Sequence, residues 1–163
     1  ANKINIDNIH FLFIGDGAEK QKVMNLANNL NTKNVTFLDP IPKEKIRDYI
    51  ASIDVALVPL KKSDLFKTVI PSKIFENAAM LKPILLGVDG ESREIVEKYQ
   101  NGLYYEPENE KDFIEKVHTL YSDNRLYESF QQGCQELAKD FNRKTLAQEM
   151  LEFLIKFNKH KDL

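Results

Sequence analysis

The chain has 163 residues, 42% of them hydrophobic and 29% charged, and a formal net charge of -2. This length suits one domain with a real core, and the near-neutral charge gives no electrostatic basis for binding nucleic acid. The single cysteine excludes an internal disulfide and fits a reducing compartment. The sequence shows neither a signal-peptide pattern nor an apolar run long enough to cross a bilayer, so we expect a cytoplasmic protein.

Short apolar runs alternate with helical patterns along the first two thirds of the chain. Five runs are expected strands, at residues 10–14, 34–38, 54–59, 83–86 and 102–105. Between them lie expected helices, among them a short one from Glu91 to Tyr99 and one after Gly17. The apolar side chains of the helix after Gly17 are Val23, Leu26, Ala27 and Leu30. From Asn109, an expected N-cap, the chain turns all-helical. The last helix carries one apolar face, formed by Leu146, Met150, Phe153, Leu154 and Phe157.

Continuous apolar strands that alternate with helices are typical of a parallel sheet covered on both faces. The expected fold class is therefore α/β, with an open, mostly parallel, Rossmann-like sheet and a helical C-terminus. Ligands in such sheets bind at the carboxyl ends of the strands. Four segments fall at that edge: the turn Gly15-Asp16-Gly17, the pair Asp39-Pro40, the pair Leu60-Lys61 and the loop before Pro71.

The stretch around Pro71 predicts an anion-binding site. Pro71 suits the first position of a helix, and the amides of Ser72 and Lys73 would then lack partners inside that helix. Free amides, the positive end of the helix dipole and the Lys73 ammonium favour a phosphate, and Glu76 lies one turn further on. This arrangement suits a nucleoside diphosphate, with the carboxylate on the ribose hydroxyls. The alternative is an ordinary helix start whose lysine and glutamate are solvated.

Other motifs point to less specific roles. Gly15-x-Gly17 is half of the dinucleotide fingerprint, and because Lys20 occupies the third glycine position an NAD site is not expected. We interpret Lys20 and Lys22 as solvated helix charges. The turn at residues 87–91 is expected to be a connecting turn, with a place in the cleft as the alternative. The histidines have no metal-ligand spacing, and no metal or cofactor is expected.

The order of these motifs resembles a known family. It runs through Phe13-Ile14-Gly15-Asp16-Gly17, Asn34-Val35-Thr36-Phe37, Asp54-Val55-Ala56-Leu57-Val58-Pro59, Pro71-Ser72-Lys73-Ile74-Phe75-Glu76, Lys82-Pro83-Ile84 and Gly102-Leu103. This order resembles the C-terminal domain of family 4 retaining glycosyltransferases of the GT-B fold. The Pro-Ser-Lys form looks most like bacterial surface-polysaccharide enzymes, including L-fucosamine transferases. The resemblance implies a nucleotide-sugar donor, expected to be a UDP-sugar, and no metal.

The resemblance also implies roles for individual residues. The family has two glutamates separated by seven residues. The second matches Glu76, the expected ribose ligand. The first falls on Thr68, and this departure concerns recognition of the donor sugar. The family's diphosphate-binding amides fall on Pro71, Ser72 and Lys73. Asp39-Pro40 corresponds to the loop where the base packs, and Gly15-Asp16-Gly17 lies beside the cleft.

The resemblance covers only part of such an enzyme. A preceding strand and helix that carry an Arg and a Lys for the diphosphate are absent, as is the N-terminal domain with the acceptor site and the usual catalytic side chain. We therefore expect residues 1–163 to form a single, partial GT-B C-terminal domain with no catalytic residue assigned. The full enzyme would transfer a hexose derivative to a saccharide or lipid-linked acceptor, with peripheral attachment to the inner face of the membrane as one option, and this chain alone would be inactive.

In the strand order 3-2-1-4-5-6 the absent strand is the central one. The gap would be covered by self-association with a neighbouring chain, by a rearranged strand order or by residues 3–8. Two other functions remain open at this point: half of a GT-B nucleotide-sugar epimerase, and a non-catalytic α/β interaction domain.

Overall fold

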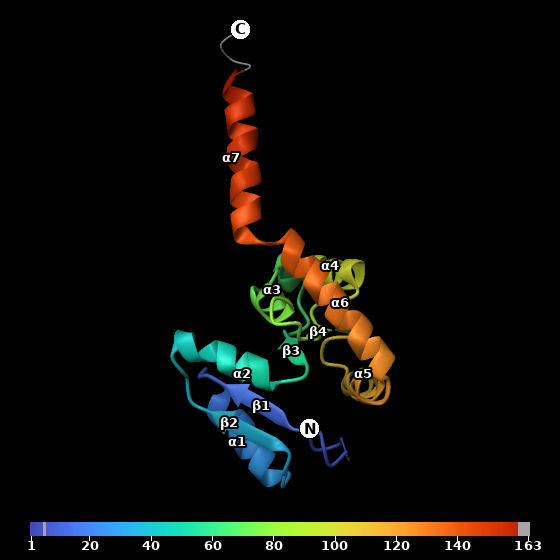
Figure 1. The fold of residues 1–163 in the computed structure, drawn as a ribbon. Coiled ribbons are helices and arrows are strands. Elements are labelled where there is room, and N and C mark those ends of the chain that lie inside the picture. Colours follow the sequence, from blue (N-terminus) through green and yellow to red (C-terminus); the bar gives the residue numbers. More distant parts are fainter. Residues whose placement is uncertain (5, 160–163) are drawn as a thin grey trace. The chain divides into compact units, whose positions relative to one another are not determined.

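A computed structural model describes residues 1–4 and 6–159 (Figure 1). The chain divides into two compact units, Ala1–Ser52 and Ile53–Leu163. Each unit contains a parallel sheet and helices of its own. That the two units form a single domain stays a prediction.

The first unit has two strands that pair in parallel. Strand β1 (Phe11–Ile14) lies beside β2 (Val35–Leu38), with Phe11 opposite Val35, and the two are joined by helix α1 (Lys20–Asn29). After β2 the chain forms a short 3-10 helix, η1 (Lys43–Lys45), and helix α2 (Ile46–Ser52). Because the strands are parallel and in register, the segments that follow them emerge at the same edge of the sheet.

Helix α1 does not bury the apolar residues that its sequence pattern suggested. Val23, Leu26 and Leu30 are 41%, 56% and 47% exposed. Ala27 of the pattern is partly buried, and so is Met24, which the pattern did not include. A two-stranded sheet presents too little apolar surface to cover a wide helical stripe.

The second unit contains the larger core. Its sheet has the order β3-β4-β5, all parallel, with β4 in the middle. Its strands are β3 (Ala56–Pro59), β4 (Ile84–Gly87) and β5 (Gly102–Tyr104). Its helices are η2 (Asp64–Thr68), α3 (Lys73–Ala78), α4 (Glu91–Tyr99), α5 (Glu110–Ser122), α6 (Asn124–Asp140) and α7 (Arg143–Lys159). The core joins the middle strand to α3, α4 and α6 through Ile74, Ala78, Ile84, Leu86, Val88, Val96, Cys134 and Leu137.

The predicted fold class is confirmed: the chain is α/β, its strands pair in parallel and its C-terminal part is helical. All five predicted strands are present, with ends shifted by at most two residues. One expectation differs, because the strands form two separate sheets rather than one. The described part of residues 3–8, all but residue 5, forms no strand, so these residues do not fill the gap as a strand, and that the segment covers the gap stays a prediction.

The C-terminal helices follow their capping signals. The side chain of Asn109 accepts a hydrogen bond from the Asp112 amide at 3.2 Å, which confirms the predicted cap of α5.

Helix α7 leaves the apolar residues of its pattern exposed, with Met150 at 64% and Phe153 at 67%. Among the described residues, none of the helices combines the length and the apolar character that crossing a membrane requires.

Cys134 is fully buried in α6, and its thiol faces the carbonyl oxygens of Lys82 and Asn101 at 3.4 and 3.7 Å. Burial raises the pKa of this thiol to about 11. At pH 8 only about a thousandth of the folded protein then carries the reactive thiolate. We expect iodoacetamide to leave Cys134 unmodified in the native protein and to alkylate it in urea, as intact-mass measurement would show. Rapid modification of the native protein would contradict this burial.

Candidate functional site

Helix α3 begins two residues later than the sequence predicted. Its first helical residue is Lys73, and Ser72 is the N-cap, so Pro71 precedes the helix instead of occupying its first position. The reason is local. The Ser72 carbonyl accepts the first helical hydrogen bond, from the Glu76 amide at 3.1 Å, while the Ile74 amide bonds back to Pro71 at 3.1 Å.

The shifted start preserves the two free amides. Within the described residues, neither the Ser72 amide nor the Lys73 amide has a hydrogen-bond acceptor. The side chains of Lys73 and Glu76 are exposed, and no described residue forms an ion pair or hydrogen bond with either of them. Two amide donors, an ammonium group and a carboxylate are therefore all available to a ligand at this end of α3.

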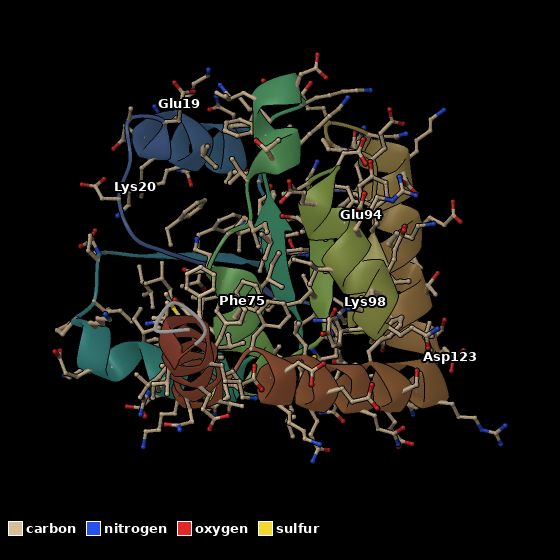
Figure 2. The ribbon with its side chains drawn as sticks, turned by 90° about the horizontal axis from the view of Figure 1, so that it is seen from above. Glu19, Lys20, Phe75, Glu94, Lys98 and Asp123 are labelled. Carbon is tan, nitrogen blue, oxygen red and sulfur yellow. The ribbon has the colours of Figure 1, made fainter. Side chains whose placement is uncertain are left out.

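The opposite face of α3 holds the helix in place. Ile74 and Ala78 are fully buried, and the buried Asn77 amide nitrogen donates to the Lys73 carbonyl at 2.8 Å. Phe75, labelled in Figure 2, packs its ring on that of Phe141, with the ring centroids 4.7 Å apart. Because one face of α3 is anchored in the core, Glu76 is directed to solvent.

Thr68 lies at the end of η2, in the segment that leads to α3. Its side chain is exposed, and its hydroxyl lies 3.5 Å from the Leu65 carbonyl, at the limit of a hydrogen bond. The same segment exposes three apolar side chains, Leu65 at 73%, Val69 at 37% and Ile70 at 39%. Thr68 and the start of α3 thus belong to one exposed stretch of the second unit.

The other predicted residues lie together in the first unit. Gly15 follows β1 with a φ of 131°, a conformation that favours glycine, and its amide donates to the Leu38 carbonyl at 3.2 Å. The Asp16 carboxylate accepts a hydrogen bond from the Gly17 amide at 2.8 Å. Asp39 and Pro40 follow β2 at the same edge and are exposed. The structure therefore brings together the turn after β1 and the residues after β2, as predicted.

Lys20 is a residue that the sequence reasoning missed. Its ammonium donates to the Asp39 carboxylate at 2.7 Å, and only 20% of its side chain is exposed, so its interpretation as a solvated charge is wrong. The hydrogen bond from Lys20, together with its positive charge, lowers the pKa of Asp39. Lys22 is 79% exposed and pairs with Glu19 on its own helix. Nothing in the sequence around Lys20 indicated a partner 19 residues away.

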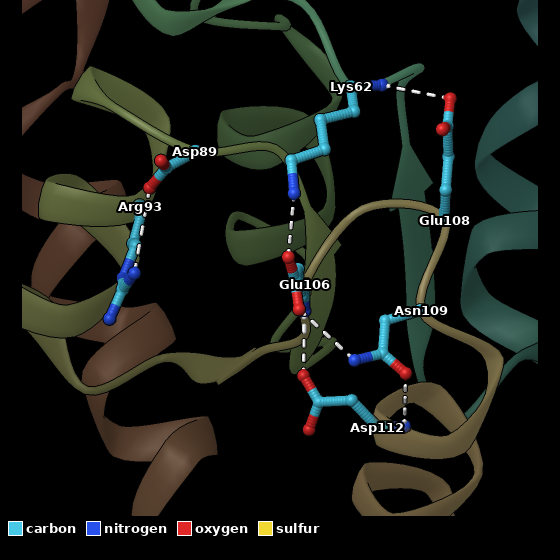
Figure 3. A network of polar contacts seen from close by, with 7 residues as sticks. All are labelled: Lys62, Asp89, Arg93, Glu106, Glu108, Asn109 and Asp112. Carbon is cyan, nitrogen blue, oxygen red and sulfur yellow. Dashed lines mark hydrogen bonds and ion pairs between the residues drawn. The ribbon is translucent and has the colours of Figure 1, made fainter.

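A polar network lies beyond the carboxyl ends of the second sheet (Figure 3). The Lys62 ammonium contacts Glu106 at 2.7 Å, and the Lys62 amide donates to Glu108 at 3.2 Å. The Glu106 amide donates to Asp112 at 2.7 Å. These contacts join the loop after β3 to the loop after β5. The Lys62–Glu106 ion pair is exposed on both sides, which makes it weak.

The described residues contain no group of three or more histidine, cysteine, aspartate or glutamate side chains arranged to hold a metal ion. The polar groups of the candidate site are instead backbone amides, one ammonium group and carboxylates. Such groups suit a ligand that combines anionic oxygens with hydroxyl groups.

The fold is α/β and of the GT-B type. HepE of Anabaena, solved in complex with UDP-glucose, superimposes with a TM-score of 0.77 at 19% identity, over 93% of this chain and 42% of that one. Residues 1–137 match the model of the family described as "Glycosyl transferases group 1", and the chain belongs to that family.

Two curated relatives are also glycosyltransferases by name. The uncharacterized glycosyltransferase MJ1178 of Methanocaldococcus jannaschii is 26% identical over 133 residues, which are 82% of this chain and 36% of that protein. TuaH of Bacillus subtilis, whose name provisionally assigns it to teichuronic acid biosynthesis, is 28% identical over 70% of this chain and 28% of its own length. The chain thus spans about a third of the length of the relatives that it matches.

Proposed function

We propose that this chain is the donor-binding part of a retaining, family 4 glycosyltransferase that uses a UDP-sugar in cell-surface polysaccharide synthesis. The observation that carries the proposal is the start of α3. There the Ser72 and Lys73 amides have no acceptor among the described residues, and the Lys73 and Glu76 side chains are exposed on a helix that is anchored in the core. Membership of the glycosyltransferase family supports it, as do the UDP-glucose complex of HepE and the name of TuaH.

Each group at the start of α3 has a role in this proposal. The Ser72 and Lys73 amides and the Lys73 ammonium bind the diphosphate, because they present donors and positive charge to anionic oxygens. The exposed Glu76 carboxylate accepts hydrogen bonds from the ribose hydroxyls. Thr68 lies on the side of the donor sugar, where its hydroxyl replaces the carboxylate that the family resemblance implies.

For the first unit by itself, we propose that Asp39 and Pro40 contact a nucleotide base and that the turn Gly15-Asp16-Gly17, at the same edge of the sheet, lies beside them. A Cβ added at Gly17 would meet nothing within 4 Å, so the surface of this turn is open. The ion pair with Lys20 limits the freedom of Asp39, so the base would meet a carboxylate that is already oriented.

Sugar transfer breaks the bond between the anomeric carbon and the diphosphate oxygen, and negative charge then develops on the leaving diphosphate. Fixed amide donors stabilise such charge without rearrangement during the reaction. In our proposal this is the task of Ser72 and Lys73, together with cationic groups from the rest of the protein. The acceptor and the remaining catalytic groups would also come from outside this chain, so the chain alone should bind nucleotide and transfer no sugar.

Titration with UDP by isothermal calorimetry tests the proposal. We expect the wild-type chain to bind UDP weakly and Glu76→Ala to bind it about ten times more weakly still, because the ribose hydroxyls would lose a charged acceptor. UDP that lacks the 2′ and 3′ hydroxyls should bind wild type and Glu76→Ala equally. Lys73→Ala should weaken UDP binding but leave the affinity for uridine unchanged.

Glu128→Ala is the matched control, since Glu128 is an exposed glutamate on α6, a helix that does not supply the proposed binding groups. Its UDP affinity should equal that of the wild type. Equal UDP affinity of Glu76→Ala and the wild type would remove Glu76 from its proposed role. A wild-type chain that binds no nucleotide would contradict the proposed function as a whole.

A further inference from the structure

The segment between β3 and α3 has little apolar packing of its own. Every residue from 61 to 70 is exposed except Phe66, which is partly buried. The segment contains η2 and Thr68 and leads directly to the amides of Ser72 and Lys73. Because few side chains anchor it in the core, its conformation depends on contacts of its backbone with neighbouring elements.

The strongest of these contacts comes from the start of α4. The Ser92 hydroxyl donates to the Val69 carbonyl at 2.6 Å, across 23 residues of sequence, and Ser92 has no exposed surface. A short hydrogen bond whose donor is buried is well suited to hold a backbone position.

Gly90 brings the same two segments together at a second point. Its φ of 79° lies in the left-handed region, and a Cβ there would lie 2.1 Å from the Lys67 carbonyl oxygen. The backbone at Lys67 therefore packs directly against the backbone at Gly90. The turn after β4, expected to serve only as a connection, thus contacts the segment at residues 67–69.

A third attachment of this segment, through Lys62, is exposed. Lys62, near its beginning, reaches Glu106 and Glu108 in the network of Figure 3. The Lys62 and Glu106 side chains are 63% and 48% exposed, so water and salt weaken their attraction. Of these attachments, the hydrogen bond at Val69, whose donor Ser92 is buried, is the closest in sequence to the candidate ligand-binding groups.

We infer that Ser92 is a positioning residue for the start of α3: by holding the Val69 carbonyl, it sets the direction in which the Ser72 and Lys73 amides point. The backbone between Val69 and Ser72 has little conformational freedom. Pro71 has a fixed φ, and Ile70, which precedes a proline, is restricted to extended conformations. This inference rests on the proposed function, because the amides matter only if they bind the donor diphosphate.

Two substitutions at Ser92 separate positioning from mere stability. Ser92→Ala removes the donor, whereas Ser92→Thr keeps the hydroxyl but crowds a fully buried site with an extra methyl group. We expect Ser92→Ala to weaken UDP binding about fivefold and to raise amide hydrogen exchange in residues 67–73 about tenfold. Ser92→Thr should lower the melting temperature and yet keep a UDP affinity close to that of the wild type.

Ser122→Ala is the control, because the Ser122 hydroxyl bonds only within its own helix, to the His118 carbonyl at 2.8 Å. It should change neither quantity. The inference is overturned if exchange in residues 67–73 is unchanged in Ser92→Ala, or if affinity follows the melting temperature in both Ser92 variants. If the wild type binds UDP and Ser92→Ala binds it with the same affinity, this inference alone is overturned. Failure of the wild type to bind UDP would overturn the proposed function and this inference together.

Discussion

Leu86→Ala is expected to lower the free energy of unfolding by about 2–5 kcal/mol, because it removes a buried side chain and leaves a cavity. Leu86 belongs to β4, the middle strand of the second sheet, and has no exposed surface. Every residue of this strand is buried, so neighbouring side chains have little room to fill the space. Urea denaturation followed by far-UV circular dichroism would measure the loss.

Leu151→Ala is the matched control for this prediction. The chemical change is the same, but Leu151 lies on α7 with half of its surface exposed, 51%. Its effect on the free energy of unfolding should stay within about 0.5 kcal/mol. Similar losses in the two variants would mean either that Leu86 is less enclosed than the structure indicates or that Leu151 is covered in solution.

Gly133→Ala is expected to destabilise the second unit by about 2 kcal/mol, although alanine ordinarily favours a helix. Gly133 lies in α6, where a Cβ would be 2.1 Å from the Tyr99 carbonyl oxygen and 2.4 Å from that of Gln100. Both obstacles are backbone atoms at the end of α4, so no side-chain rotation can relieve the clash. The two helices would have to separate. Thermal unfolding followed by circular dichroism would show a lower melting temperature.

Gly17→Ala provides the comparison. A Cβ at Gly17 meets nothing within 4 Å, so this substitution should change the melting temperature by no more than a few degrees. An unchanged melting temperature for Gly133→Ala would contradict the close approach of α6 to the end of α4. The same approach packs α6 near α3, since Phe141, which follows α6, contacts both Phe75 and Tyr99.

The sequence predicted those features that depend on residues close to one another along the chain. The strands were found because each is a continuous apolar run that ends at a glycine, a proline or a polar turn. Helix α4 was predicted with its observed bounds, Glu91–Tyr99. The start of α3 was misplaced by two residues, because proline is compatible with several positions near a helix start and the hydrogen bond between Glu76 and Ser72 decides among them.

Contacts between distant residues were beyond the reach of the sequence pattern. The partner of Lys20, Asp39, follows the next strand along the chain, and so the sequence pattern predicted only a solvated charge at Lys20. The contact between Ser92 and Val69 joins a helix start to a loop 23 residues earlier, and neither residue type indicates the other. Most apolar residues of the α1 and α7 patterns are exposed, because helical spacing alone does not determine which surface covers them.

The sequence by itself determined the alternation of strands and helices, the α/β class and the candidate groups Ser72, Lys73 and Glu76, because apolar periodicity and helix-start chemistry act over a few neighbouring residues. The tertiary structure decided that the strands form two sheets, that Lys20 binds Asp39 and that Ser92 holds the segment before α3. Those features depend on which backbone and side-chain groups meet after the chain has folded, and residues far apart in the sequence compete for each such contact.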